Sequence, residues 1–496
     1  MTFPTSTPST QGIDPAGLHA FLDALDTDPV IEPHGLIIQR HGRRVLEGYW
    51  RPHTAEQIRL VYSLSKSFTG TALGLAIGDG LVDLDDLVGD HLPELTADAS
   101  ARTLEMRVRH LASMSTGHAD ETLLDAFIAN PTDPLAGFFT VEPQHDPGTW
   151  FAYNQPPVLA LSALLQHATG RRMNDLLRER VLDPIGIRDL RWYQYRPDVD
   201  LGFSGVFTNL DAIARLGQLY LDDGMWDGEQ VLPQGWVALA SSTQTDNSHR
   251  PEPDWSRGYG FQFWMCRHGY RGDGAFGQYM VILPEHDTVV AFFSHTEPMQ
   301  SFMDLIWDVL LPALGPTDES LASADHDVGS ALALALGPDG DAAIAQRTAS
   351  LALATAAQRT GWGNPLDRAV AGRFERSDSG ADHPSITSID VELDLDVDRS
   401  CTGSASVGTL VVHEGDHSIR VPLSSGWTEV DGHPIATSAA VHDDGSISVD
   451  LMITASPHRL EIRTDATSST FSATWPITPL FGMGLDSVLA KIAPPD

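Results

Sequence analysis

The chain has 496 residues and is strongly acidic, with a formal net charge of −36 from 31 Lys and Arg against 67 Asp and Glu. Hydrophobic residues make up 42% and charged residues 20%, which is typical of a globular protein and excludes a disordered or fibrous one. Because so acidic a surface repels phosphate backbones and anionic lipids, we expect neither a nucleic-acid partner nor a membrane partner.

Cysteine usage and the N-terminal pattern argue against a secreted protein held together by disulfides or metal. Cys266 and Cys401 are far apart in the sequence, and no His/Cys cluster has the spacing of metal ligands. The first ten residues lack the basic start and apolar run of a signal peptide, and no apolar stretch is long enough to span a bilayer. We therefore expect a cytoplasmic protein without a metal or other cofactor.

The predicted elements of the first 315 residues indicate an α+β domain. Apolar residues at helical spacing behind an Asp-Pro start predict a helix over residues 14–26, and two β-rich runs around His41-Gly42 predict an antiparallel hairpin. A helix over about residues 64–78 leads into a mostly helical segment that ends near residue 200. Three strands and a closing helix follow, at residues 258–266, 278–283, 288–293 and 299–314. We expect an antiparallel sheet flanked by helices, with a helical insertion.

The composition changes after Gly315. Residues 316–365 are predicted to form a linker that contains an Ala/Leu-rich helix. From residue 366 to the end the pattern is β throughout, as in Val391–Asp398, where apolar and acidic residues alternate with a period of two. We predict three parts: a first domain over residues 1–315, the linker, and a C-terminal antiparallel β domain, a barrel or a sandwich, over residues 366–496.

Lysine is almost absent from the chain, since only Lys66 and Lys491 occur among the 31 basic residues. Arginine cannot lose its proton in a protein, whereas lysine can once its pKa is depressed. Lys66 belongs to the segment Ser63-Leu-Ser-Lys66, and if Ser63 opens a helix, its hydroxyl and the amine lie one turn apart on one face. A neutral amine there could accept the hydroxyl proton and activate Ser63 as a covalent nucleophile. The alternative is a serine-rich helix start with a solvated lysine.

The Ser-x-x-Lys segment and three later segments together resemble the serine β-lactamase-related superfamily. This group includes class C β-lactamases, D,D-peptidases, family VIII carboxylesterases and 6-aminohexanoate-oligomer hydrolases. The later segments occur in the family's order at Arg109–Gly117, Pro147–Gln155 and Gly205–Asp211. The resemblance covers roughly residues 14–315 and implies a β-lactamase/transpeptidase-like fold for the first domain.

The resemblance implies roles for four residues of the first two motifs. Ser63 would be the acylated nucleophile, Lys66 its proton partner and Tyr153 a general acid/base. A phenol has an ordinary pKa near 10, so Tyr153 would need a neighbouring positive charge such as Lys66 to act at neutral pH. Tyr153 could instead be a core aromatic residue. Gln155 stands where the family has Asn, and we expect it to line the site.

The third motif of the family departs most from the pattern. Where the family has a basic residue, a variable residue and Gly on an edge strand, this chain has Gly272-Asp273-Gly274, followed by Ala275. We expect Asp273, Gly274 and Ala275 to contact the substrate. The backbone N–H groups of Ser63 and Ala275 could still stabilise an oxyanion, because that role needs no side chain.

The missing basic residue removes the positive charge that grips a substrate carboxylate in the family. This loss favours esters or amides without an essential carboxylate. Arg271 and His268 are near enough in the sequence to replace the charge, although turn residues on a hairpin are more often simply solvated.

The leading hypothesis is a serine hydrolase that cleaves a small-molecule ester or amide through an acyl-enzyme on Ser63. The alternatives are a D,D-peptidase or weak β-lactamase and, from another class, a catalytically inactive homologue that binds a peptide or other ligand. The sequence leaves open the physiological substrate, the choice of ester or amide, the role of the β domain and whether the protein forms a homo-oligomer.

Overall fold

The computed structural model describes residues 3–315, 339–363, 365–377, 385–394, 406–480, 482 and 484–492. The chain divides into two compact units, one formed by Met1–Gly48 and Val61–Ala349, the other by Tyr49–Leu60 and Ser350–Asp496. Residues 316–338 of the predicted linker, and Cys401, lie outside the described residues. No helix in the described ranges is long and apolar enough to cross a membrane.

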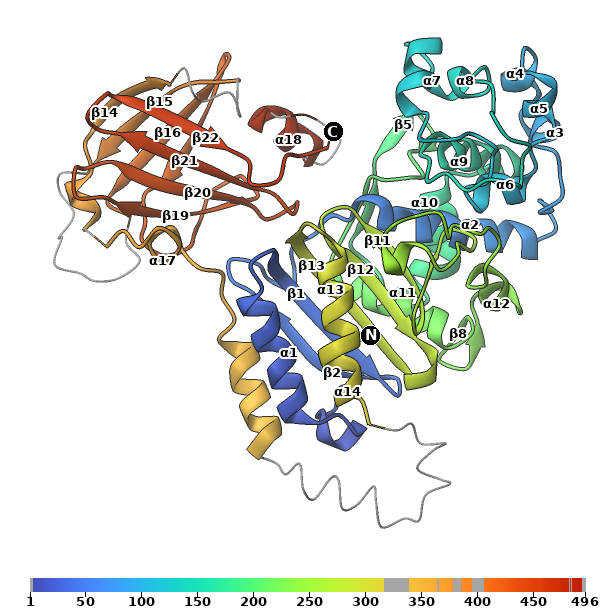
Figure 1. Ribbon diagram of the computed structural model, residues 1–496, viewed down its shortest axis with the longest axis horizontal. Helices are drawn as coiled ribbons and strands as arrows, with labels where there is room; N and C mark the ends of the chain where they lie inside the picture. The colour runs from blue at the N-terminus through green and yellow to red at the C-terminus, as the bar shows by residue number, and fades with distance from the viewer. Residues whose placement is uncertain are drawn as a thin grey trace. The chain divides into compact units, whose positions relative to one another are not determined.

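A six-stranded sheet in the order β10-β11-β12-β13-β1-β2 forms the centre of the first unit (Figure 1). Its strands are β1 (Ile31–Arg40), β2 (Arg43–Tyr49), β10 (Trp264–Cys266), β11 (Gly269–Gly274), β12 (Gln278–Leu283) and β13 (Thr288–Thr296). The antiparallel pair of β1 and β13 joins the beginning of the unit to its end. The predicted hairpin is confirmed: His41 and Gly42 both have positive φ, at 50° and 65°, as a two-residue type I′ turn requires.

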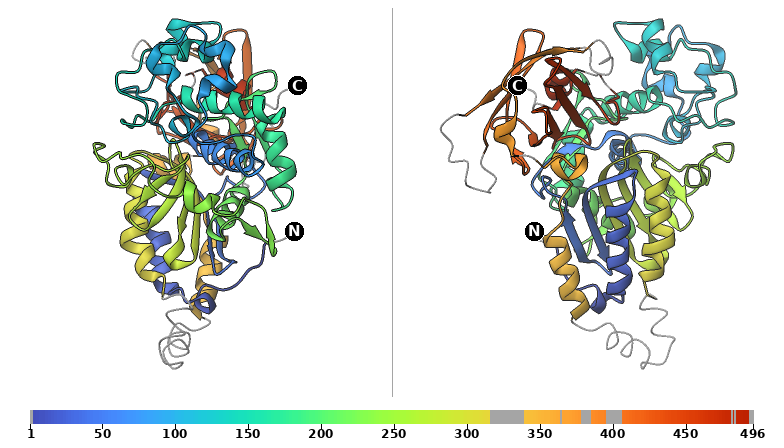
Figure 2. Two further views of the ribbon diagram at one scale, coloured as in Figure 1. Left: turned by 90° about the vertical axis from the view of Figure 1, so that its right-hand side faces the viewer. Right: turned by 60° about the vertical axis from the view of Figure 1, so that its left-hand side comes forward.

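Helices cover both faces of this sheet (Figure 2). Phe292 of β13 stacks on Phe302 of α13 (Gln300–Leu305), with ring centroids 4.0 Å apart. Val289, three residues earlier on the same strand, lies against Gly217 of α11 (Leu210–Leu221). Because residues an odd number apart on a strand face opposite sides, α13 and α11 cover opposite faces. The predicted first and last helices are confirmed, as α1 (Pro15–Thr27) and as α13, η6 (Ile306–Leu310) and α14 (Leu311–Ala313).

The predicted helical insertion is confirmed between the hairpin and the returning strands. α2 (Ser65–Gly78) is buried on all sides from Ser65 to Ala76 and packs against α9 (Pro156–Thr169) and α10 (Met173–Leu177). The other helices here are α3 (Val88–His91), α4 (Pro93–Thr96), α5 (Ala101–Leu104), α6 (Val108–Ala112), α7 (Leu123–Ala129), α8 (Pro134–Phe138), η3 (Arg178–Leu182) and, further along the chain, α12 (Trp236–Ala240). Short strands follow at β4 (Leu190–Trp192), β5 (Gln194–Arg196), β6 (Val199–Asp200), β7 (Val206–Thr208), β8 (Met225–Trp226) and β9 (Glu229–Gln230).

The second unit contains one nine-stranded sheet, which confirms the predicted C-terminal β domain. The strand order is β17-β16-β15-β14-β22-β21-β20-β19-β18. The sheet curls back toward itself, because the Ala439 N–H donates 2.7 Å to the carbonyl of Ser424, just beyond β17. Its strands are β14 (Gly372–Arg376), β15 (Ile386–Leu393), β16 (Gly408–Glu414), β17 (His417–Pro422), β18 (Thr428–Glu429), β19 (Ile435–Val441), β20 (Ile447–Ile453), β21 (Arg459–Asp465) and β22 (Thr470–Thr474), with helices α17 (Ala356–Thr360) and α18 (Leu485–Ile492).

An early segment of the chain, Tyr49–Leu60, belongs to this second unit. The Arg51 N–H donates 3.2 Å to the carbonyl of Leu351, and the Leu60 N–H donates 3.0 Å to that of Ala455. The short strand β3 (Arg59–Leu60) ends the segment. Ser63 follows three residues later, so the chain passes from the second unit directly into the candidate nucleophile turn. A division in simple chain order does not anticipate this excursion.

Candidate active site

Ser63 lies in a tight turn, η2 (Tyr62–Leu64), directly before α2. Tyr62 has a φ of 49°, a conformation that is costly for a bulky residue and that persists only where the surroundings fix it. Ser65 provides such a restraint: its hydroxyl donates 2.6 Å to the Tyr62 carbonyl and accepts at 3.0 Å from the Val206 N–H. The turn therefore holds the Ser63 hydroxyl in one position at the start of the buried helix.

Lys66 lies beside Ser63, as the spacing predicts, with 3.1 Å between its Nζ and the Ser63 Oγ. The amine also donates 2.7 Å to Gln155 Oε1 and 2.9 Å to the Phe203 carbonyl, and the residue is only 1% exposed. Burial lowers the pKa of Lys66 to about 7, although the carboxylates of Asp273 and Glu121 act in the opposite direction. A substantial fraction of this amine is therefore neutral at pH 7.

Tyr153 faces both of these residues. The Lys66 Nζ lies 4.7 Å from the centroid of the phenol ring, and the phenol hydroxyl is hydrogen-bonded to Ser63. The ring stacks on Trp264 of β10 at a centroid distance of 5.0 Å. Burial raises the pKa of Tyr153 well above its ordinary value, and the Asp273 carboxylate adds to that effect. The positive charges that lower this pKa are those of Arg250 and Arg271, but burial outweighs them, so the phenol keeps its proton at neutral pH.

The third motif lies on β11, which passes tightly against the nucleophile turn. A Cβ at Gly274 would lie 2.1 Å from the carbonyl oxygen of Val61, and one at Gly272 would lie 2.3 Å from the Ser67 Oγ. The side chains of Ser67 and Leu64 therefore leave no room for a basic side chain at position 272 unless they move. The N–H of Ala275, which follows β11, has no acceptor among the residues that the structure describes. β10 pairs with β11 only at Gly269–Arg271, so the motif residues Gly272–Gly274 are paired with β12 alone.

Arg271 cannot supply the missing charge, and its interpretation as a solvated turn residue is wrong. It lies within β11, is fully buried, and its Nε donates 3.0 Å to Asp273 Oδ2. Burial raises the pKa of Asp273, whereas the charge and hydrogen bond of Arg271 lower it. Trp264 also bonds to this carboxylate, so Arg271 and Asp273 form a buried ion pair rather than presenting a charge to a substrate.

His268 also lies away from the site. It sits in the turn between β10 and β11, with its ring 5.2 Å from that of Trp307. Six residues of extended chain separate it from Gly274, which corresponds to about 20 Å. A histidine at that distance does not replace the basic residue of the family's third motif.

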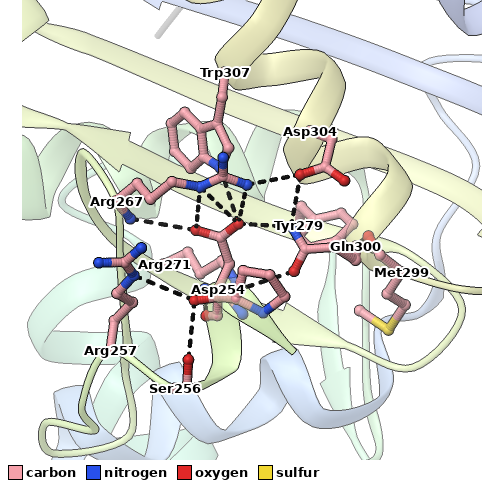
Figure 3. Close-up of polar contacts among 11 residues, drawn as sticks. Asp254, Ser256, Arg257, Arg267, Arg271, Tyr279, Met299, Gln300, Asp304 and Trp307 are labelled. Carbon is pink, nitrogen blue, oxygen red and sulfur yellow. Dashed lines mark hydrogen bonds and ion pairs between the residues drawn. The ribbon is translucent and has the colours of Figure 1, made fainter. Parts of the chain in front are cut away.

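A buried polar network surrounds Asp254, and Arg271 belongs to it (Figure 3). The Asp254 carboxylate accepts 2.8 Å from Arg267 Nη2, 2.6 Å from Gln300 Nε2 and 3.0 Å from Trp307 Nε1. Burial opposes ionisation, but these hydrogen bonds hold the pKa of Asp254 at about 2. Its backbone carbonyl accepts 2.7 Å from Arg271 Nη1, which fixes the guanidinium beside Asp273. Within the described ranges, no group of His, Cys, Asp and Glu side chains could hold a metal ion.

The structure brings all seven predicted residues into one region, and it adds two that no motif marks. Glu121 Oε1 accepts 3.1 Å from the Gln155 N–H and 3.1 Å from the Leu123 N–H, so it holds the second motif against the start of α7. Phe203 accepts from the Lys66 amine through its carbonyl, and its ring centroid lies 5.8 Å from the same amine. A single loop carboxylate and a backbone carbonyl carry no sequence signal, which is why the motif comparison missed both.

Known proteins match this chain in sequence over its first unit. A family model described as Beta-lactamase matches residues 28–314. The chain is 26% identical over 281 residues to the 6-aminohexanoate-dimer hydrolase of Paenarthrobacter ureafaciens, covering 51% of this chain and 70% of the relative. It is 25% identical over 292 residues to penicillin-binding protein 4 of Amycolatopsis lactamdurans, covering 51% and 76%.

A solved structure shares the fold. This Bacillus anthracis protein, assigned as a 6-aminohexanoate-dimer hydrolase, superimposes with a TM-score of 0.52 and 18% identity, covering 66% of this chain and 89% of that one. The family match extends over more than half of the residues, from the first strand of the central sheet, β1, to the helix α14. The chain therefore belongs to the beta-lactamase family of serine hydrolases.

Proposed function

We propose that the protein hydrolyses an ester or amide bond of a small molecule through an acyl-enzyme on Ser63. The observation that carries this proposal is the buried Lys66 amine, with a pKa of about 7, at 3.1 Å from the Ser63 hydroxyl. Gln155 and the Phe203 carbonyl orient the amine by accepting its hydrogen bonds, so its lone pair can face Ser63 when it is neutral.

In the acylation step, the neutral Lys66 amine takes the proton of Ser63 while Oγ attacks the carbonyl carbon of the substrate. The carbonyl oxygen becomes an oxyanion, which the N–H groups of Ser63 and Ala275 stabilise. Tyr153 gives its phenol proton to the leaving group as the scissile bond breaks, and the Lys66 ammonium returns a proton to the phenolate. The phenol of Tyr153 is protonated at neutral pH, so it has a proton to give when the leaving group departs.

Deacylation reverses these roles with water as the nucleophile. Lys66, again neutral, takes a proton from the attacking water. As the tetrahedral intermediate collapses, the Lys66 ammonium gives that proton to Ser63 Oγ, 3.1 Å away, so that the acid leaves and the Ser63 hydroxyl and the neutral amine are restored. The named activities of two relatives support the substrate class, because one is a 6-aminohexanoate-dimer hydrolase and another a lovastatin esterase. We extend to this chain only what they share, the hydrolysis of an acyl bond.

The test is labelling by a fluorophosphonate, read by intact-protein mass, with turnover of p-nitrophenyl butyrate measured on the same samples. Wild type should gain one adduct, and Ser63→Ala should gain none and lose turnover. Ser67→Ala, a buried serine one turn further along α2, is the matched control and should still label. If wild type neither labels nor turns over, the protein is a ligand-binding homologue. If Ser63→Ala still labels, the nucleophile is another residue.

A further inference from the structure

A cavity of about 250 Å³ lies in the first unit, away from the nucleophile turn. It is lined by the C-terminal end of α11, the β8–β9 hairpin, the β1–β2 turn at Gly42 and the first described residues of the chain (Figure 1). β1 ends at Arg40, level with the end of β12, whereas Gly274 beside the nucleophile turn pairs with Gln278, the first residue of β12. The cavity and the candidate active site therefore lie at opposite ends of the central sheet.

Asp222 brings to this cavity a carboxylate that no cation of the described residues neutralises. The residue is open to solvent on part of its surface, and its two carboxylate oxygens accept from Gln218 Nε2 at 3.0 Å and 3.1 Å. Partial burial raises the pKa of Asp222 against these hydrogen bonds, and the nearby Asp287 carboxylate adds to the rise. Asp222 also follows the last turn of α11, where the helix carries a partial negative charge. The position therefore favours a cation.

The arginines on the other side of the cavity are already matched by carboxylates. Arg215 Nε donates 2.7 Å to Asp211 Oδ2, and Arg44 shares that carboxylate. Glu47 lies 2.8 Å from Arg44, so two cations face two carboxylates. Asp227, in the turn of the β8–β9 hairpin, is exposed and forms no ion pair with a described residue. The cavity therefore has an excess of negative charge, which disfavours an anionic ligand.

Two aromatic rings belong to the cavity wall. Trp226 of β8 and Phe3 have ring centroids 6.1 Å apart and planes inclined by 54°. The face of an aromatic ring attracts a cation, most strongly for an indole. Arg44 and Arg215 use Phe3 in this way, at 5.4 Å and 5.7 Å from its centroid, whereas no cation of the described residues lies over the Trp226 ring. The indole is therefore available to a cation from outside the protein.

We propose that this cavity binds a small organic ammonium ion, whose charged group contacts Asp222 and whose carbon chain lies against Trp226. The ammonium donates charge-assisted hydrogen bonds to the carboxylate, and the indole contributes both apolar contact and a cation–π interaction. A metal ion fits less well, because among the residues that the structure describes no group of His, Cys, Asp and Glu could hold one. The inference does not depend on the Ser63 mechanism, since the two sites lie at opposite ends of the sheet.

Two probes of similar size that differ in charge, n-butylammonium and 1-butanol, test the proposal, with the ionic strength held constant by sodium chloride. In saturation-transfer NMR titrations, wild type should bind n-butylammonium with a Kd at least roughly 10-fold below that for 1-butanol. Asp222→Asn should weaken n-butylammonium binding roughly 10-fold, and Trp226→Leu should weaken it about threefold or more. Asp223→Asn is the matched control, because Asp223 is an exposed acid next to Asp222 that does not line the cavity. It should change the Kd by less than about twofold.

The indole N–H signal of Trp226 reports where the probe binds in the wild type, without any substitution at Asp222. This signal, assigned by its absence from Trp226→Leu, should shift when n-butylammonium is added and should not shift with the same concentration of sodium chloride. An unchanged signal, or equal affinity of wild type for the two probes, overturns the site. Equal losses of affinity in Asp222→Asn and Asp223→Asn also overturn it, because the ammonium is then attracted by the acidic surface in general.

Discussion

The two sides of the candidate site differ in the kind of group that they supply: one supplies side chains and the other supplies backbone. On the α2 side the reacting groups are side chains, since the Ser63 hydroxyl and the Lys66 amine lie 3.1 Å apart. On the β11 side the proposed group is the Ala275 N–H, and the strand excludes side chains at Gly272 and Gly274. A position whose side chain reacts must keep its amino acid type. A position that supplies only its backbone must keep a side chain small enough to fit. The third motif can therefore diverge from its family while the first cannot.

The largest effect is expected from replacing the proton acceptor on the α2 side. Lys66→Arg keeps a positive charge, but a guanidinium does not release its proton in a protein. We expect kcat/KM for p-nitrophenyl butyrate to fall on the order of 10³-fold, and fluorophosphonate labelling to slow by a similar factor. Lys66→Met, which removes both the charge and the amine, should fall at least as far. An active Lys66→Arg together with an inactive Lys66→Met would mean that the charge, not proton transfer, is what this position supplies.

A smaller but substantial loss is expected from adding one methyl group on the β11 side. The Cβ of Gly274→Ala would lie 2.1 Å from the Val61 carbonyl oxygen, so β11 or the nucleophile turn must move. Misplacement of about 1 Å at a reacting centre costs roughly 100-fold, and we expect kcat/KM to fall roughly 10- to 100-fold. Gly363→Ala is the control, because a Cβ there meets no atom within 4 Å. Full activity of Gly274→Ala would show that the close approach of β11 has no role in the reaction.

The same distinction explains what the sequence could predict. Periodic apolar patterns predicted α1, the β1–β2 hairpin and the β domain, because burial on one face of an element leaves a regular signal. The Ser63–Lys66 pair was predictable because both side chains belong to one helical turn. β11 was partly misread: its run of Gly, Tyr, Arg and Asp has no strand-like alternation, so Arg271 passed for a turn residue.

Other features depend on contacts between residues that are distant in the sequence. The excursion of Tyr49–Leu60 into the second unit is held by backbone hydrogen bonds to Leu351 and Ala455, which no local pattern encodes. The direction of the shift in the Tyr153 pKa depends on how deeply its phenol is buried. Such effects follow from the packing of whole elements and become visible only in the folded chain.

Asp254 tests whether the β11 side needs its supporting network for stability rather than for chemistry. Asp254→Asn leaves the backbone carbonyl that holds Arg271 but removes the charge that Arg267 contacts. We expect the free energy of unfolding to fall by about 2–4 kcal/mol in urea denaturation, with kcat/KM changed less than about threefold. Asp304→Asn is the matched control, because Asp304 contacts the same Arg267 but is 48% exposed, and it should cost less than about 1 kcal/mol. Equal losses in the two variants would contradict a special role for the buried carboxylate.

The smallest effect is a shift in pH dependence that links the α2 side to a loop carboxylate. Because the neutral amine is the reactive form, kcat/KM for p-nitrophenyl butyrate should rise as the pH increases through about 7, the pKa of Lys66. The Glu121 carboxylate stabilises the ammonium and so raises that pKa. Glu121→Gln removes the charge but keeps an oxygen that can accept from the Gln155 N–H. The acid limb of the pH profile, where kcat/KM falls as the pH decreases, should therefore move to lower pH by less than about one unit.

Asp120→Asn is the control, because Asp120 is an exposed acid directly before Glu121 in the chain. This variant should leave the acid limb of the pH profile unchanged. A general loss of negative charge would move the acid limb in both variants by the same amount. A shift to higher pH in Glu121→Gln would mean that the limb reports a group other than Lys66, because removing a carboxylate cannot raise the pKa of a neighbouring amine through its charge. The α2 side would then owe its activity to a different titrating group, even with Ser63 as the nucleophile.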